Sequence, residues 1–170
     1  MRAILLHHSA AALLAAFFVT TAQAAAPQPL TEESFAQIRA RYAGQPLVVH
    51  IWGMSCGPCV GELPKWGELR RAHPGMNLVL IQADASPPEA TERALKDAGL
   101  AKAESWAAPQ ELDEYLRASI DPKWIGDMPR TLLVSSAGKT ETLRGVADLA
   151  AVQRWLQQQQ QQQSKSKVRP

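Results

Sequence analysis

The sequence contains very little cysteine: two residues in a chain of 170, with only two positions between them. So little cysteine excludes a small domain stapled by several disulfides, and the fold must therefore rest on its apolar core. It also argues against a structural zinc site, because such a site needs about four nitrogen or sulfur ligands. Scattered histidines do not complete the set, and no histidine follows His73.

An excess of charge of one sign is also lacking. Lysine and arginine number 18 and aspartate and glutamate 16, which gives a formal net charge of +2 at pH 7. This near-neutral balance gives no support for nucleic-acid binding, which depends on neutralising many phosphates. The chain is 46% hydrophobic and 20% charged, as expected for an ordinary globular domain, and no internal repeat is visible.

Long hydrophobic runs are absent as well. The apolar run at residues 10–19 is too short to span a membrane comfortably. It follows the positive Arg2 and precedes Ala22-Gln23-Ala24, a small-x-small pattern typical of a signal-peptidase site. We therefore predict a signal peptide over residues 1–24 and export of the remaining chain. The alternative is an uncleaved N-terminal anchor.

Both cysteines lie in one stretch, residues 50–64, where an apolar run gives way to a helical pattern. Cys56 would sit just before the helix, close to unpaired backbone N–H groups and the positive end of the helix dipole. Both favour the thiolate, which is the attacking species in disulfide exchange. Cys59, one turn further on, would be more enclosed and able to attack a mixed disulfide formed at Cys56. The pattern therefore predicts a redox-active pair.

Two other interpretations of the cysteines fit less well. A purely structural disulfide would close so short a loop that it would constrain little of the unfolded chain. Two unrelated buried thiols would not need the turn that Gly57-Pro58 places between them.

Hydrophobic periodicity predicts a chain of alternating helices and strands. Residues 47–52 are short, β-branched and nearly all apolar, as in a central strand covered on both faces. Residues 100–108 show no clear pattern. The other expected strands are 78–81, 131–134 and 140–144, and the expected helices are 31–43, 59–72, 86–99, 109–119 and one that begins after Asp148.

The domain organisation follows from these patterns. Residues 25–45 form a leader and a helix, and residues 46–156 form the main domain. Seven glutamines, 157–163, precede a tail with three basic residues. We expect the last helix to extend by a turn or two into the glutamines, and the Gln-rich and basic tail over 157–170 to be disordered.

The order of elements and the motifs resemble the thioredoxin superfamily, and in particular the exported TlpA/ResA-type disulfide reductases. Cys56-Gly57-Pro58-Cys59 is identical to the thioredoxin active-site tetrapeptide. Trp52 matches the tryptophan four residues before the first cysteine, and Pro64 matches the kink proline. Glu62-Leu63-Pro64 resembles the acidic-apolar-Pro triplet of the TlpA/ResA group. The resemblance covers roughly residues 46–156.

The resemblance implies a fold and several site residues. The fold is α/β: a thioredoxin fold with a central mixed β-sheet flanked by helices, a central insertion at residues 100–119 and an N-terminal helical extension. Pro129, after Met128, falls where the superfamily places a cis-proline loop, whose edge would pair with a substrate segment. The alternative is a trans proline that opens a strand.

Two further residues are candidates for proton transfer. The family motif places an acid at Glu62, for which the alternative is a solvated helix glutamate. His50 lies six residues before Cys56, where thioredoxins have a buried aspartate. It either relays a proton to or from Cys59 or is a hydrogen-bonded core histidine without a chemical role.

Departures from the family pattern lie around Cys56. Ser55 stands where most relatives have a second tryptophan, which should make the surface there smaller and more polar. Arg130 replaces a common threonine and, if near the sulfurs, would favour the thiolate.

The resemblance implies a periplasmic reductant of client disulfides, of the cytochrome c or copper-site assembly type. A membrane electron donor of the DsbD/CcdA type would restore the dithiol. We expect a monomer with no cofactor, no metal and no nucleic-acid partner. The alternatives are a DsbA-like oxidant and a copper-binding metallochaperone, the latter weakened by the lack of a downstream histidine.

Overall fold

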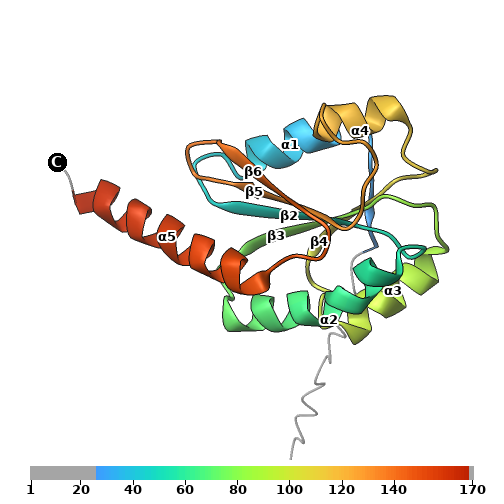
Figure 1. Ribbon diagram of the computed structural model, residues 1–170, viewed down its shortest axis with the longest axis horizontal. Helices are drawn as coiled ribbons and strands as arrows, with labels where there is room; N and C mark the ends of the chain where they lie inside the picture. Colours follow the sequence, from blue (N-terminus) through green and yellow to red (C-terminus); the bar gives the residue numbers. More distant parts are fainter. Residues whose placement is uncertain (1–25, 169–170) are drawn as a thin grey trace, which may run out of the picture.

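The computed structural model describes residues 26–168, so the expected signal peptide lies outside the described residues. Six strands form one sheet in the order β1-β4-β3-β2-β5-β6 (Figure 1). Strands β1, β4, β3 and β2 are parallel, whereas β5 runs antiparallel to β2 and β6 antiparallel to β5. The strands are β1 Gln28–Pro29, β2 Leu47–Trp52, β3 Asn77–Gln82, β4 Glu104–Ala107, β5 Arg130–Val134 and β6 Thr140–Arg144.

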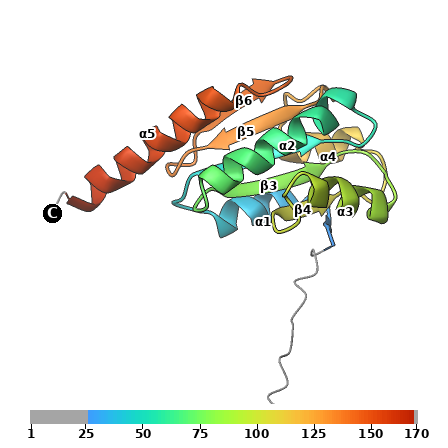
Figure 2. The same cartoon turned by 90° about the horizontal axis from the view of Figure 1, so that it is seen from below.

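Helices cover both faces of this sheet (Figures 1 and 2). Helices α1 and α4 pack on one face, where side chains such as Phe35 and Ile120 join the core. Helices α2, α3 and α5 pack on the other. The helices are α1 Ser34–Arg41, α2 Gly57–Ala72, α3 Pro88–Asp97, α4 Glu114–Ile120 and α5 Leu149–Val168.

The central strand β2 is buried along its whole length, as the apolar run predicts. Because successive side chains of a strand point to opposite faces, Val49 and Ile51 enter the α1/α4 core. Val48 and Trp52 enter the α2/α3/α5 core together with Cys59. The start of α2 therefore lies at the carboxyl end of the buried strand β2. The predicted α/β fold with a mixed central sheet is confirmed.

The N-terminal extension and the central insertion are joined at Glu104 on β4. Its carboxylate accepts hydrogen bonds from Tyr42 (2.7 Å), Arg41 (2.7 Å) and the indole of Trp106 (2.9 Å). Burial, followed by the nearby Glu104 carboxylate, raises the pKa of Tyr42 to about 12. The phenol therefore stays a donor across the ordinary pH range.

The structure differs from the sequence expectations at three places. Residues 100–108, which show no clear pattern, contain β4, and the leader contributes the two-residue strand β1 beside it. Helix α4 begins only at Glu114, because Asp113 caps it by accepting the Leu116 N–H at 2.8 Å. Helix α5 continues through the glutamines to Val168 rather than giving way to disorder after a turn or two.

Helix α5 extends beyond the rest of the domain in both views (Figures 1 and 2). Val152 and Leu156 anchor its first turns in the core, and Gln159 is the last buried side chain that the structure describes in it. Within residues 26–168, every helix is too short or too polar to cross a membrane.

Candidate active site

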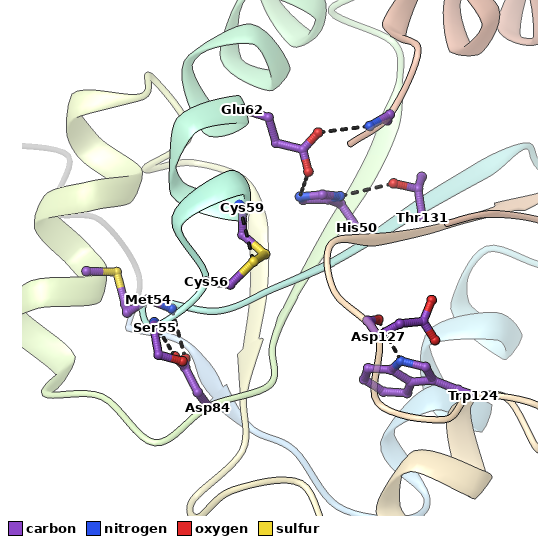
Figure 3. The surroundings of a disulfide bond; sticks show 11 residues. His50, Met54, Ser55, Cys56, Cys59, Glu62, Asp84, Trp124, Asp127 and Thr131 are labelled. Carbon is purple, nitrogen blue, oxygen red and sulfur yellow. Dashed lines mark hydrogen bonds and ion pairs between the residues drawn. A yellow bond between two sulfur atoms is a disulfide. The ribbon is translucent and has the colours of Figure 1, made fainter. Parts of the chain in front are cut away.

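A disulfide between Cys56 and Cys59 lies at the junction of β2 and α2 (Figure 3). Cys56 is the N-cap of α2, and its Sγ accepts the backbone N–H of Cys59 at 3.3 Å. Cys56 is half-buried, whereas Cys59 has no exposed surface. The pair therefore offers one sulfur to a partner and keeps the other inside, as the sequence predicts.

The local sequence explains how this turn forms. The N–H of Cys56 bonds to the carbonyl of Gly53 at 3.3 Å, closing a tight turn after β2. Pro58 lies exposed in the first turn of α2, where a missing N–H costs no helical hydrogen bond. Helix α2 then runs on through Pro64, which is exposed to solvent.

Behind the disulfide, His50 and Glu62 face each other in the core (Figure 3). His50 Nε2 lies 3.4 Å from Glu62 Oε1, and neither atom has a hydrogen-bond partner in the described part of the chain. His50 Nδ1 lies 3.1 Å from Thr131 Oγ1, and Glu62 Oε2 accepts the N–H of Ala147 at 3.0 Å. Glu62 is 2% exposed, so it is not a solvated helix glutamate.

The pair sits in a low-dielectric environment that opposes charge on either partner. Burial lowers the pKa of His50 to about 3, which leaves its imidazole neutral. Burial raises the pKa of Glu62, although the Ala147 N–H and Lys65 work against that. The proton between the two side chains can therefore be on Nε2 of His50 or on Oε1 of Glu62. In the first case the Thr131 hydroxyl donates to Nδ1, and in the second it accepts from Nδ1.

The predicted cis-proline loop is also present, since the Met128–Pro129 bond is cis. The carbonyl of Pro129 accepts the N–H of Gly145 at 2.9 Å, which ties the loop to the end of β6. Met128 packs against both cores and lines a cavity of about 240 Å³ together with Ser55. The loop is thus placed beside the start of α2.

Arg130 does not point toward the sulfurs. Its neighbour Thr131 faces His50, so the strand pleat turns Arg130 to the opposite face. There the residue is buried, and its guanidinium bonds to Asp121 at 2.6 Å and to Asp127 at 3.2 Å. The idea that it favours the Cys56 thiolate is therefore not supported by its position.

Two tryptophans complete the enclosed side of the site. Trp52 and Trp66 are fully buried in the same core as Cys59. The rings of Trp66 and His50 lie 4.7 Å apart at a tilt of 33°. Apolar walls of this kind keep water from the buried sulfur and strengthen the electrostatic effects behind it.

The structure thus brings together most of the residues that the sequence singles out. Cys56, Cys59, His50, Glu62 and Trp52 gather at one end of β2 and α2. Pro58 is exposed in the first turn of α2, whereas Pro129 is buried in its cis-proline loop. Sequence reasoning missed Thr131, Trp66 and Asp84. Strand alternation could have found Thr131, because it is the core-facing neighbour of Arg130.

Metal binding finds no preformed site here. Residues 26–168 contain no group of three or more histidine, cysteine, aspartate or glutamate side chains arranged to hold a metal ion.

Neither a protein-family model nor a curated protein matches the chain. Solved structures do. A thioredoxin-family thiol:disulfide interchange protein from Chlorobium tepidum superposes with a TM-score of 0.56 at 17% identity, over 71% of this chain and 83% of that one. The chain has the thioredoxin fold.

Two further solved structures share this thioredoxin fold. A secreted disulfide oxidoreductase of Mycobacterium tuberculosis, homologous to DsbE of E. coli, gives a TM-score of 0.54 at 18% identity, over 66% of this chain and 81% of that one. StoA from Bacillus subtilis gives 0.51 at 21% identity, over 66% and 83%. Such low identity establishes the fold alone.

Proposed function

We propose that this protein is a thiol–disulfide oxidoreductase that reduces disulfides in exported client proteins. The observation that carries the proposal is the Cys56–Cys59 disulfide at the start of α2, half-exposed at one sulfur and enclosed at the other. The cis-Pro129 loop beside it offers an edge to which an extended client segment can pair.

The reaction needs only the two cysteines and the client. In the reduced protein the Cys56 thiolate attacks one sulfur of the client disulfide, forming a mixed disulfide and releasing a client thiolate, which takes up a proton. Cys59 then loses its proton and attacks Cys56, which releases the second client thiolate. Two electrons pass to the client, and the Cys56–Cys59 disulfide remains.

Glu62 and His50 are suited to receive the proton of Cys59. Glu62 lies three residues after Cys59 on α2, a spacing that places both side chains on the same helix face. A carboxyl whose pKa is raised by burial, facing a neutral imidazole, can take a proton from a nearby thiol and return it. Glu62 therefore acts as the base during resolution, and His50 positions it.

The reducing direction is supported by what surrounds Cys56. A strong oxidant such as DsbA stabilises its reduced form, and a stabilised thiolate is one route to that. Here Arg130 forms ion pairs with Asp121 and Asp127 on the other face of the sheet, so it does not stabilise a Cys56 thiolate. The protein then needs its electrons replaced, and we propose a membrane donor of the DsbD/CcdA type.

The place of action is proposed on two grounds. The signal-peptide pattern at residues 1–24 predicts export to the periplasm, and the Mycobacterium tuberculosis structure with the same fold is of a secreted protein. Apocytochromes c and copper-site assembly proteins are the client classes we propose, from the resemblance of the Glu62-Leu63-Pro64 motif to the TlpA/ResA group.

The decisive experiment equilibrates the Cys56–Cys59 pair of the mature protein against glutathione or dithiothreitol. A potential near that of thioredoxin, around −270 mV, supports the reductant. A value near that of DsbA, around −120 mV, makes the protein an oxidant and overturns the proposed direction.

A trapping experiment tests the roles of the two cysteines. Cys59→Ser should accumulate mixed disulfides with clients at Cys56, because the resolving thiol is gone. Cys56→Ser, the matched control, should accumulate none. Equal trapping by both variants would contradict the assigned roles.

A further inference from the structure

An acid outside the predicted site holds the loop that carries Cys56 (Figure 3). Asp84, two residues beyond the end of β3, is 8% exposed. Its carboxylate accepts the backbone N–H of Met54 at 3.0 Å and that of Ser55 at 2.6 Å. These are the two residues immediately before Cys56, so the contact fixes the approach to the reactive sulfur.

Asp84 is itself held from behind by a buried polar network. Gln82 donates its amide to Asp84 Oδ1 at 3.1 Å and to the Asp84 carbonyl at 3.2 Å. Thr91 on α3 donates to Gln82 Oε1 at 2.9 Å. On the other side, a Cβ at Gly53 would lie 2.9 Å from the Asp84 carboxyl carbon, so only glycine leaves room. The carboxylate therefore has one position.

We propose that Asp84 is a positioning residue that makes the Cys56–Cys59 pair more strongly reducing, by holding a fixed negative charge under the loop before Cys56. The proposal rests on the proposed function and deepens it. Asp84 touches no substrate, and it acts through the two backbone N–H groups and through its charge.

The physical reason is the effect of that charge on the Cys56 thiolate. Backbone N–H groups before a helix would otherwise help to stabilise an anion at its N-terminus. Asp84 occupies those of Met54 and Ser55 and adds a negative charge, which disfavours a second anion nearby. A less stabilised thiolate shifts the equilibrium toward the disulfide and makes the dithiol a stronger reductant.

Asp84 carries this charge across the working pH range. Burial opposes ionisation, but hydrogen bonds from Ser55, Met54 and Gln82 outweigh it and hold the pKa of the Asp84 carboxyl below its ordinary value.

Other charged side chains around Asp84 come from two helices or their flanks. Glu111 and Arg117 line the same cavity of about 240 Å³, and the Arg117 guanidinium donates to the Leu112 carbonyl at 2.7 Å. From α3, Arg93 and Asp97 line a separate groove beside Met54. Each set holds one cation and one anion, so neither cancels the charge of Asp84 by itself.

The test is Asp84→Asn in the mature protein, with two readouts. We expect the equilibrium constant with glutathione to shift about fivefold toward the dithiol, roughly 20 mV at 29.6 mV per tenfold. We also expect the Cys56 thiolate, followed by its ultraviolet absorbance, to form at lower pH than in the wild type.

Two control variants separate charge from loss of structure. Glu68→Gln removes one exposed negative charge from α2 and should leave both readouts unchanged. Thr91→Val breaks the network behind Asp84 but keeps the carboxylate, so it should lower stability and leave the potential near wild type. An unchanged potential in Asp84→Asn, or an equal shift in Thr91→Val, would overturn the proposal.

A measurement on the wild type keeps the proposal testable if Asp84→Asn does not fold. The amide proton resonances of Met54 and Ser55 should follow the ionisation of Asp84 and, in the reduced protein, respond again when Cys56 ionises. If the resonances of both amides stay unchanged in both titrations, the contact between Asp84 and the loop is refuted. The reduction potential of the wild type tests the proposed function separately. The proposal on Asp84 predicts only how the potential of a variant differs from that value.

Discussion

The burial of His50 makes the fold sensitive to acid. In the unfolded chain His50 takes up a proton near the ordinary pKa of 6.5, whereas burial keeps it neutral in the folded protein down to about pH 3. Between these values the unfolded form binds more protons, so stability must fall as the pH falls through this window.

The His50→Asn variant should remove this acid sensitivity. We expect its unfolding free energy to change less between pH 6.5 and pH 4 than that of the wild type, where one proton shifts the unfolding equilibrium by up to about tenfold per pH unit. Denaturant unfolding at several pH values measures this. Identical pH profiles for the two proteins would show that His50 is not the titrating group.

Glu62 should show a conflict between stability and activity. Because burial raises its pKa, its contribution to stability is present at low pH and is lost as the pH rises from 4.5 through the raised value. Glu62→Gln should therefore be at least as stable as the wild type at pH 7.

Resolution of the mixed disulfide by Glu62→Gln should slow by about tenfold or more, since the proton acceptor is gone. Stopped-flow mixing with a client disulfide measures the rate, and an unchanged rate would exclude the proton-acceptor role.

The site residues that could be predicted from the sequence are those with a recognisable spacing along the chain. The cysteines, Glu62 and Pro129 belong to motifs whose spacing is visible in one sequence. Asp84 lies in no such motif, because its partners Met54 and Ser55 are brought to it only when β2 and β3 pair. The orientation of Arg130 could have been predicted, because neighbouring side chains of a strand such as β5 point to opposite faces, and Arg130 is next to Thr131.

At the scale of elements, the contact of α2 with α3 depends on one glycine. Gly67 is buried on α2, and a Cβ there would collide with the carbonyl oxygen of Ala98. Helix α2 can approach the end of α3 this closely only without a side chain at that position.

Gly67→Ala should therefore destabilise the fold by about 1–3 kcal/mol through overpacking, despite the better helix propensity of alanine. Gly61→Ala is the matched control on the same helix: it is exposed, a Cβ meets nothing within 4 Å, and we expect a gain of up to about 1 kcal/mol. Urea unfolding of both variants tests this, and equal effects would contradict the close contact.

The elements that the sequence did not predict are those fixed by distant partners. Strand β4, Glu-Ser-Trp-Ala, has neither an apolar run nor alternation, and β1 contains a proline. Strand β4 exists because it pairs with β3 and because Glu104 is held by Tyr42, and β1 exists because it pairs with β4. The buried strand β2 and the helix α2, by contrast, carry their pattern within their own residues.

At the scale of the whole molecule, the direction of electron flow is linked to stability. If the pair is a reductant, folding favours the disulfide, so the oxidised protein should resist unfolding more than the reduced one. The two cysteines are separated by 3 in sequence, and the chain-entropy relation for so short a loop gives about 2 kcal/mol. Denaturant midpoints of both forms test this, and a more stable reduced form would indicate an oxidant.

The enclosure of Cys59 has one consequence for what the protein can carry. With its sulfur, His50 and Glu62 all buried, a bare electron pair delivered to Cys59 would leave an uncompensated charge inside the core. Reduction must therefore bring a proton with it, and oxidation must take one out. The enclosed half of the site thus transports hydrogen equivalents rather than electrons, and its midpoint potential should fall steadily as the solution becomes more alkaline.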